Sequence, residues 1–219
     1  YVMSGQVTSL YTLSIPNYQL VVNMAGELVE TSVDNGDGTF TYNVPVRQGY
    51  TWSDGSPITA NDWQFTFDTV KGLSLGGNFL SAYPYLCEGD DGSSKNCVVS
   101  VVASDDYTVS VTFNYDPGLS TWQYGTAQGP AFSKAYWESI ATDKESLYAH
   151  DAINAPVASA FVYDKLEQGA FYTWKYDANT MWYGGTTTIY DGGGTSVNWD
   201  NGKAPAFSGD FGNTSGDSF

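Results

Sequence analysis

The residues that could carry chemistry in this chain are one histidine, two cysteines and many carboxylates. His150 would have to be the base of any Ser-His-Asp triad, and it lies between Ala149 and Asp151 near the end of an expected helix. That position is typical of a surface histidine. Phosphate-binding glycine loops of the P-loop or dinucleotide type are absent from the sequence. We therefore expect neither an enzyme nor a cofactor.

The carboxylates are numerous enough to supply a catalytic pair. Glycosidases use two Asp or Glu residues, and the seven tryptophans of this chain could form platforms for sugar rings. However, no spacing in the sequence singles out two of the 24 acidic residues. An extracellular glycoside hydrolase is therefore the third of the functions that we consider.

The two cysteines, Cys87 and Cys97, flank a polar loop. Zinc thiolates are usually spaced more closely and need further Cys or His ligands, so we expect no metal site. We favour a local disulfide over two free thiols, and the loop-entropy model gives such a bond about 2.5–3 kcal/mol of stabilisation. A disulfide indicates an oxidising compartment outside the cytoplasm.

The charge balance is that of a chain poor in basic residues. Eight basic and 24 acidic residues give a formal net charge of −16 at pH 7. Nucleic-acid binding is excluded, because it requires a Lys and Arg surface that neutralises phosphates. Hydrophobic residues make up 42% of the chain, which is too many for a disordered protein, and no apolar run is long enough for a membrane span.

The elements that must position any site begin with a strand over residues 39–46. Its apolar side chains alternate with polar ones, as expected for a half-buried strand: Phe40, Tyr42, Val44 and Val46. Pro45 cannot donate to a sheet ladder, so it predicts an edge position or a bulge. The glycine-rich run over residues 34–38 predicts the preceding turn.

The most strongly patterned stretch covers residues 52–72. Asp54 and Gly55 predict a tight turn, and Thr59 with Asp62 three residues later predicts a capping box. The helix that follows presents three apolar residues on one face, Trp63, Phe67 and Val70, and we expect it to end near Gly72.

The remaining periodic segments are shorter. Residues 98–102 and 107–113 predict a hairpin, residues 133–141 and 144–150 predict short helices, and residues 161–163 and 170–174 predict two strands. From residue 184 the chain is rich in Gly, Ser, Thr, Asn and Asp, and only residues 186–190 have a strand pattern. The fold class expected is α+β (mixed α/β).

Residues 26–73 resemble the signature region of the oligopeptide-binding type of ABC-transporter solute-binding proteins, family 5. The family pattern begins with an acidic turn that contains Gly, an alternating strand and a basic residue before a Gly. A turn with Asp-Gly, Pro and Thr-Ala at fixed spacing follows, and it leads into a helix. The residues of this sequence that fill this pattern are Arg47, Trp52, Asp54, Gly55, Pro57, Thr59 and Asp62. We interpret them as scaffold, with Arg47 paired to a nearby carboxylate.

Later segments are similar to the same family in order and spacing. They are residues 104–113, 132–138, 154–163 and 175–185. At residues 158–161 the chain reads Ala-Ser-Ala-Phe where the family has Gly-Thr-Gly-Pro. The resemblance covers about residues 10 to 190 and maps to the N-terminal part of family members, which are more than twice as long.

The resemblance implies a periplasmic-binding-protein-like type II lobe with an inserted β-rich subdomain, and an incomplete one. Residues 1–185 would form this lobe, and residues 186–219 would lead toward the missing remainder. The second lobe would belong to the same chain or to another chain. Because Tyr1 begins directly in polar sequence, we expect a mature form or a piece of a longer protein.

The function that the resemblance implies is capture of a peptide or oligosaccharide between two lobes and delivery to an ABC permease. The protein would be extracellular or in the cell envelope, and tethered to the membrane. Four aromatic residues outside the signature are the candidate ligand contacts, with core packing as the alternative for each: Tyr11, Tyr18, Trp122 and Tyr124. A structural protein of an envelope layer or filament that reuses this scaffold is the second choice.

Overall fold

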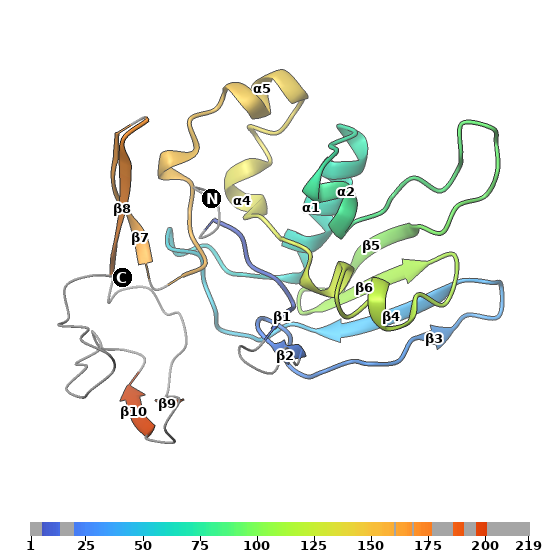
Figure 1. Cartoon of the computed structure of the whole chain (residues 1–219), viewed down its shortest axis with the longest axis horizontal. Coiled ribbons are helices and arrows are strands. Elements are labelled where there is room, and N and C mark those ends of the chain that lie inside the picture. Colours follow the sequence, from blue (N-terminus) through green and yellow to red (C-terminus); the bar gives the residue numbers. More distant parts are fainter. Residues whose placement is uncertain are drawn as a thin grey trace.

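The computed structural model describes residues 6–13, 20–159, 161–167, 169–176, 186–190 and 196–200. Its centre is an antiparallel sheet with the strand order β3-β4-β6-β5 (Figure 1). The strands are β3 (Val33–Asp34), β4 (Phe40–Pro45), β6 (Thr108–Phe113) and β5 (Val98–Asp105). Helix α1 (Ala60–Gly72) packs on β5 and β6, so helix and sheet share one core. The expected mixture of α and β structure is confirmed.

Strand β4 has one buried and one solvated face. Tyr42 and Val44 are buried in the core. On the opposite face the hydroxyl of Thr41 shares a hydrogen bond of 2.9 Å with the hydroxyl of Thr112 in β6. This alternation confirms the period-two pattern, because successive side chains of a strand point to opposite faces of the sheet.

Pro45 lies in an inner strand, so the predicted edge position or bulge is wrong: beyond the end of β3, residues 25 and 26 pair with this part of the chain. The Gly26 N–H donates to the Pro45 carbonyl at 2.7 Å, whereas the Val46 N–H donates to Tyr107 in the direction of β6. The N and C=O groups of one residue in an antiparallel strand point to the same side, so the missing Pro45 N–H faces away from β6. Strand β3 pairs only with Phe40 and Thr41, and it has ended before Pro45.

Helix α1 begins and packs as its sequence predicts. A capping box joins Thr59 and Asp62 at its start. Trp63, Phe67 and Val70 are all buried on the face that meets the sheet. Burial of such a stripe, more than helix propensity, is what stabilises a helix of this length.

Within the described residues, four shorter helices lie beside this core. They are α2 (Asn78–Ala82), α3 (Gly118–Thr121), α4 (Lys134–Trp137) and α5 (Lys144–Ala149). Helices α4 and α5 confirm the two helices predicted here, although α4 is shorter than expected, while α2 and α3 were not predicted. Helices α4 and α5 lie on the same side of the sheet as α1 (Figure 1). Among the described residues, no helix combines the length and apolarity that crossing a bilayer needs.

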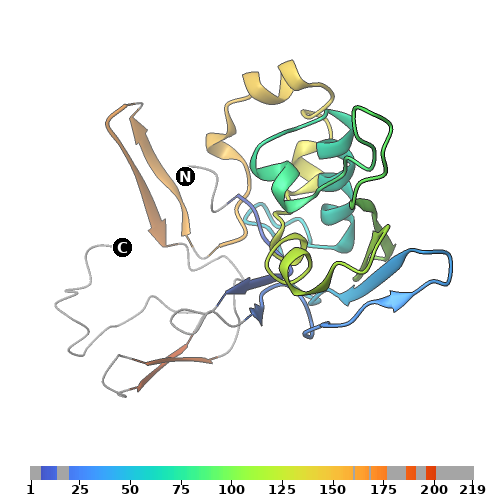
Figure 2. The ribbon, with the colours of Figure 1, turned by 45° about the vertical axis from the view of Figure 1, so that its right-hand side comes forward.

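In the part of the chain that the structure describes, three antiparallel strand pairs lie outside the central sheet. Strands β1 (Tyr11–Leu13) and β2 (Leu20–Val22) form one, β7 (Phe161–Glu167) and β8 (Phe171–Tyr176) the second, and β9 (Thr186–Tyr190) and β10 (Ser196–Asp200) the third. The β7–β8 hairpin projects from the body of the protein in both views (Figures 1 and 2). The prediction that the tail has no strand beyond residues 186–190 is wrong, because β10 pairs with β9 along its length.

Candidate functional site

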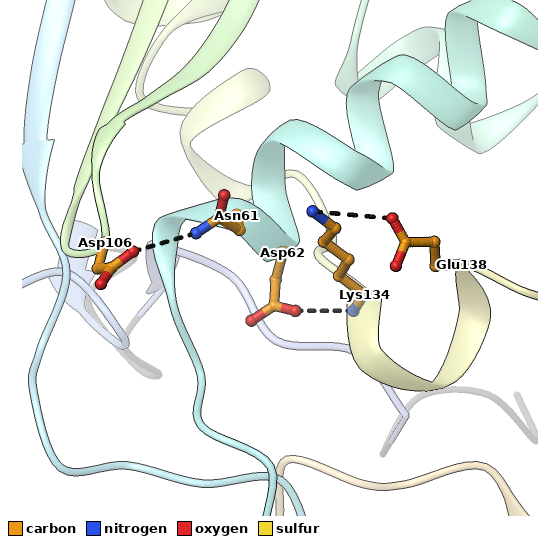
Figure 3. A network of polar contacts seen from close by, with 5 residues as sticks. All are labelled: Asn61, Asp62, Asp106, Lys134 and Glu138. Atoms are coloured by element: carbon orange, nitrogen blue, oxygen red, sulfur yellow. Dashed lines mark hydrogen bonds and ion pairs between the residues drawn. The ribbon is translucent and has the colours of Figure 1, made fainter.

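Asp62 is the polar centre of the signature region. Its carboxyl group is buried, with 3% of the residue exposed, yet three donors reach it. Oδ2 accepts from the Thr59 N–H at 2.9 Å and from the Trp52 indole N–H at 3.4 Å. Oδ1 accepts from the backbone N–H of Lys134 at 2.7 Å, which ties the start of α1 to the start of α4 (Figure 3).

The environment of Asp62 acts on its pKa in two directions. Burial raises the pKa, and the hydrogen bonds from Lys134 and Thr59 lower it in part. Around this carboxylate, Lys134 pairs with Glu138 at 3.8 Å, and Asn61 donates to Asp106 at 3.5 Å (Figure 3). These outer contacts are exposed, so they contribute little, and Asp62 is the residue that joins the segments.

The turn before α1 is shaped by Asp54 and Gly55, as predicted. Asp54 Oδ1 accepts from the N–H of Ser56 at 2.9 Å, and Gly55 has φ = +86°, which favours glycine. Pro57 closes the turn in a bridge with Thr51. These contacts make the signature a rigid local structure.

The same turn forms hydrogen bonds with the segment around Val157, about a hundred residues later in the chain. The Ser53 N–H donates to the Val157 carbonyl, and the Val157 N–H donates to Ser53 Oγ, both at 2.9 Å. Trp52, Val157 and Ala158 are buried beside this contact. The signature therefore fixes the backbone path of the segment before β7.

Arg47 holds the end of β4, but not through an ion pair. Its Nε donates to the Ala25 carbonyl at 3.1 Å, and its backbone N–H donates to Met24 at 2.8 Å. Within the described ranges no carboxylate forms a salt bridge with it. The expected carboxylate partner is thus wrong for these residues, where the Nε–H of Arg47 donates to a backbone carbonyl instead.

Tyr11 and Trp122, two of the four candidate ligand contacts, are fully buried. The Tyr11 hydroxyl donates to the Glu27 carbonyl and accepts from the Val29 N–H, both at 3.0 Å. The Trp122 indole N–H donates to the Val29 carbonyl at 2.9 Å. In this structure both residues pack in the core, and neither side chain offers surface to a solute.

Tyr124 differs from its neighbour Trp122, because 53% of it is exposed. It lies between α3 and the 3-10 helix η2 (Thr126–Gln128), and η2 contacts β1. Trp122 is anchored in the core by stacking on Tyr42, with ring centroids 3.9 Å apart. An anchored Trp122 fixes the position from which Tyr124 projects. Tyr18, the fourth candidate, lies outside the described residues.

The predicted disulfide is confirmed. Cys87 and Cys97 are bonded, with their Cα atoms 5.1 Å apart. Within the loop that they close, the Gly89 N–H donates to the Ser93 carbonyl at 2.7 Å. The bond fastens this exposed loop to the start of β5.

Two further features are not among the candidate sites predicted above. One is a mostly apolar cavity of about 220 Å³ between α1, α2, α4 and α5, which none of the four candidate contacts lines. The other is the stretch Gly72–Gly76, Gly-Leu-Ser-Leu-Gly, which has the G-x-S-x-G spacing of serine hydrolases. A spacing of this kind indicates a nucleophile only where a strand precedes the serine and a helix follows it.

The structure places that serine at the end of a helix instead. The Leu75 N–H donates to the Val70 carbonyl and the Ser74 N–H donates to Lys71, which is a Schellman-type helix end with φ = +49° at Ser74. His150, the one histidine, shares a hydrogen bond of 2.9 Å with the Tyr136 hydroxyl. Among the described residues no group of His, Cys, Asp and Glu could hold a metal ion.

Solved structures share this fold. An oligopeptide-binding protein of Thermotoga maritima with bound mannohexaose superposes with a TM-score of 0.58 at 20% identity, over 80% of this chain and 29% of that one. DppA of Helicobacter pylori, in complex with the peptide STSA, superposes with a TM-score of 0.57 at 16% identity, over 83% of this chain and 35% of that one. The chain thus spans about a third of the length of these relatives.

Sequence comparison identifies the family. The dipeptide-binding protein DppE of Bacillus subtilis is 36% identical over 80 residues, which are 33% of this chain and 14% of DppE. The family model of the bacterial extracellular solute-binding proteins, family 5 (middle region), matches residues 23–203. This match includes the whole signature turn, α1 and the central sheet. The chain therefore belongs to the bacterial extracellular solute-binding proteins of family 5.

Proposed function

We propose that this chain is part of the solute receptor of an ABC importer, and that the receptor captures peptides. The observation that carries the proposal is the family match over residues 23–203, within which the signature residues form the hydrogen-bonded scaffold around Asp62. Relatives with this scaffold are binding proteins, so the activity proposed is capture and release, without chemical conversion of the solute.

Membership of the family also supports a proposal for the lobes, the motion and the location of the receptor. Residues 1–185 would form most of one lobe with its inserted subdomain, and residues 186–219 would lead toward the second lobe. Hinge closure of two lobes around a solute is the usual motion of such receptors, and the closed form would dock on a membrane permease. The disulfide supports a location outside the cytoplasm, where we propose that the protein is tethered to the membrane.

Peptides are the ligands that we favour over oligosaccharides. DppE is named for dipeptides and the Helicobacter pylori relative holds a peptide, whereas the Thermotoga maritima relative holds mannohexaose. We propose Tyr124 as a ligand contact because it is the exposed member of the three described candidates. An exposed tyrosine on a fixed backbone offers a flat apolar ring and a hydroxyl at low entropic cost.

Thermal unfolding of the full-length protein with and without solutes tests the proposal. A ligand at about 100 times its Kd should stabilise the folded protein by about 2.7 kcal/mol. We expect pools of two- to six-residue peptides to raise the Tm, and mannohexaose to leave it unchanged. Tyr124→Ala should reduce the shift, while Tyr148→Ala, which removes another exposed tyrosine, should preserve it.

Two results would count against this function. A Tm rise with mannohexaose alone would indicate that the receptor captures oligosaccharides and not peptides. A Tm that no solute changes, together with ordered self-assembly of the purified protein, would favour the structural envelope protein instead.

A further inference from the structure

The turn between β3 and β4 contains a dipeptide that is prone to spontaneous deamidation. Asn35 is followed by Gly36, and both residues are exposed at one end of the central sheet, at the right of Figure 1. Asn-Gly is the most reactive sequence for this change, because glycine has no Cβ to obstruct its own backbone nitrogen. The Asn35 amide would therefore be short-lived in an unfolded chain of this sequence.

Deamidation consumes only water. A base removes the Gly36 N–H proton, the nitrogen bonds to Asn35 Cγ, and the Cγ–Nδ2 bond breaks while Nδ2 takes up a proton and leaves as ammonia. The resulting five-membered imide is then opened by water at either of its two carbonyl carbons. The products are aspartate or isoaspartate at position 35, and no electrons are exchanged with another molecule.

Both reacting groups are held in other contacts in the folded turn. Asn35 Nδ2 donates to the Thr39 hydroxyl at 2.8 Å and to the Thr41 hydroxyl at 2.9 Å. The Gly36 N–H donates to Asp34 Oδ1 at 2.8 Å. A carboxylate at this position opposes removal of the Gly36 proton, because the nitrogen would become negative and like charges repel. The departing Nδ2 must also break its bonds to both hydroxyls.

The two hydroxyls that hold Asn35 are themselves fixed by neighbouring residues. The Thr39 hydroxyl donates to Asp37 Oδ1 at 2.6 Å, and the Thr41 hydroxyl shares a hydrogen bond of 2.9 Å with Thr112 in β6. The Asn35 N–H donates to the Thr39 carbonyl at 3.0 Å, which closes the turn. Release of the Asn35 amide therefore requires local opening of the turn, a process whose free energy is below that of global unfolding.

We propose that Asn35 is a modification site that the folded turn keeps closed, and that opening of the turn exposes it to deamidation. In isoaspartate the main chain runs through the former side chain, which adds one backbone atom to the turn. The length of the turn sets the register in which Val33 pairs with Thr41 and Asp34 with Phe40, so this product would displace β3 from β4. The site does not depend on solute capture.

Peptide mapping of the full-length protein by mass spectrometry tests the proposal. The folded protein and a synthetic peptide of residues 33–41 are incubated at pH 8, and conversion of the Asn35 amide to a carboxyl group is followed with time. We expect conversion in the folded protein to be slower by about tenfold or more, because three hydrogen bonds must be broken. Mapping separates this site from Asn201–Gly202, the other Asn-Gly pair of the sequence, which lies outside the described residues.

Replacing the two hydroxyls tests the contacts themselves. Thr39→Val/Thr41→Val removes both acceptors of Asn35 and keeps the β-branched shape, so conversion in the folded variant should rise about fivefold or more. Thr108→Val is the matched control, because Thr108 lies in β6 on the same face as Thr112 and its hydroxyl is not one of the Asn35 acceptors. Its conversion should equal that of the unchanged protein. The thermal transition checks that both variants are folded.

Two outcomes would overturn the proposal. One is conversion of Asn35 in the folded full-length protein at the same rate as in the synthetic peptide. The other is a folded Thr39→Val/Thr41→Val variant that converts no faster than Thr108→Val. Slow conversion that is lost in both the peptide and the double variant supports the proposal.

Discussion

Replacing Asp62 with asparagine tests whether one buried carboxylate joins the signature turn, α1 and α4. The two oxygens of Asp62 accept from the Thr59 N–H, the Trp52 indole and the Lys134 N–H. Asparagine has one acceptor oxygen and one NH₂ group. Whichever way its amide is turned, the NH₂ group faces one of the two backbone N–H groups, and that hydrogen bond is lost.

The expected loss of stability in Asp62→Asn follows from these contacts. A buried donor without an acceptor costs about 1–3 kcal/mol, and hydrogen bonds to a charged group contribute about 1.5–3 kcal/mol. We therefore expect Asp62→Asn to lower the free energy of unfolding of the protein by about 2–3 kcal/mol. For a unit of 150–250 residues this corresponds to a fall in Tm of about 4–12 °C.

Differential scanning calorimetry of the full-length protein at pH 7 measures the effect. Asp68→Asn is the matched control, since it removes the same charge from an exposed position of α1 and should change stability by less than about 0.5 kcal/mol. Amide hydrogen exchange should show faster exchange at Lys134 or Thr59 in the Asp62 variant alone. Equal Tm values for the two variants would refute the role given to Asp62.

Three further predictions concern single features of the scaffold. Reducing the disulfide at Cys87 should cost about 2–3 kcal/mol, seen as a lower Tm with a reductant, and an unchanged Tm would contradict it. Gly55→Ala, at φ = +86°, should cost about 1–2 kcal/mol, whereas Gly76→Ala, which has open space and no positive φ, should not lower the Tm. Burial raises the pKa of Tyr11 from 10.0 to about 12, so the stability that it contributes is complete below pH 10 and is lost as the pH rises toward 12. Tyr11→Phe should therefore flatten the fall of Tm between pH 10 and 12, and an unaltered slope would count against this assignment.

Local chemistry made the central elements predictable from sequence. Thr59 and Asp62 define a helix start within four residues, and the alternation along β4 defines a strand within eight, because each signal depends only on neighbours in the chain. The disulfide likewise depends on two cysteines in one short loop. These features are correct in type and nearly correct in their bounds.

Contacts between segments far apart in the chain could not be predicted from the sequence. Asp62 meets the Lys134 N–H, and Ser53 meets Val157 about a hundred residues away, through backbone groups that every residue carries. For the same reason the partner of Arg47 is a backbone carbonyl that no sequence pattern indicates. Residue type also did not separate Trp122 from Tyr124, because burial of an aromatic ring is decided by the assembled core.

Short elements without apolar periodicity were missed. Helix α2 has five residues and no buried side chain, so it leaves no amphipathic stripe to detect. Strand β10 lies in a tail rich in Gly, Thr and Asn, where composition favours loops. The G-x-S-x-G spacing at Gly72–Gly76 is the opposite case, since its pattern matches a catalytic motif while its backbone ends a helix.

We propose that this family 5 chain belongs to a receptor that captures peptides. Isothermal titration calorimetry of the full-length protein, with the peptide that raises its Tm most, tests this function. We predict saturable binding of one peptide per protein, weakened by Tyr124→Ala and unaffected by Tyr148→Ala. Absence of saturable binding for every peptide tested, in a protein that is folded by its thermal transition, would contradict it.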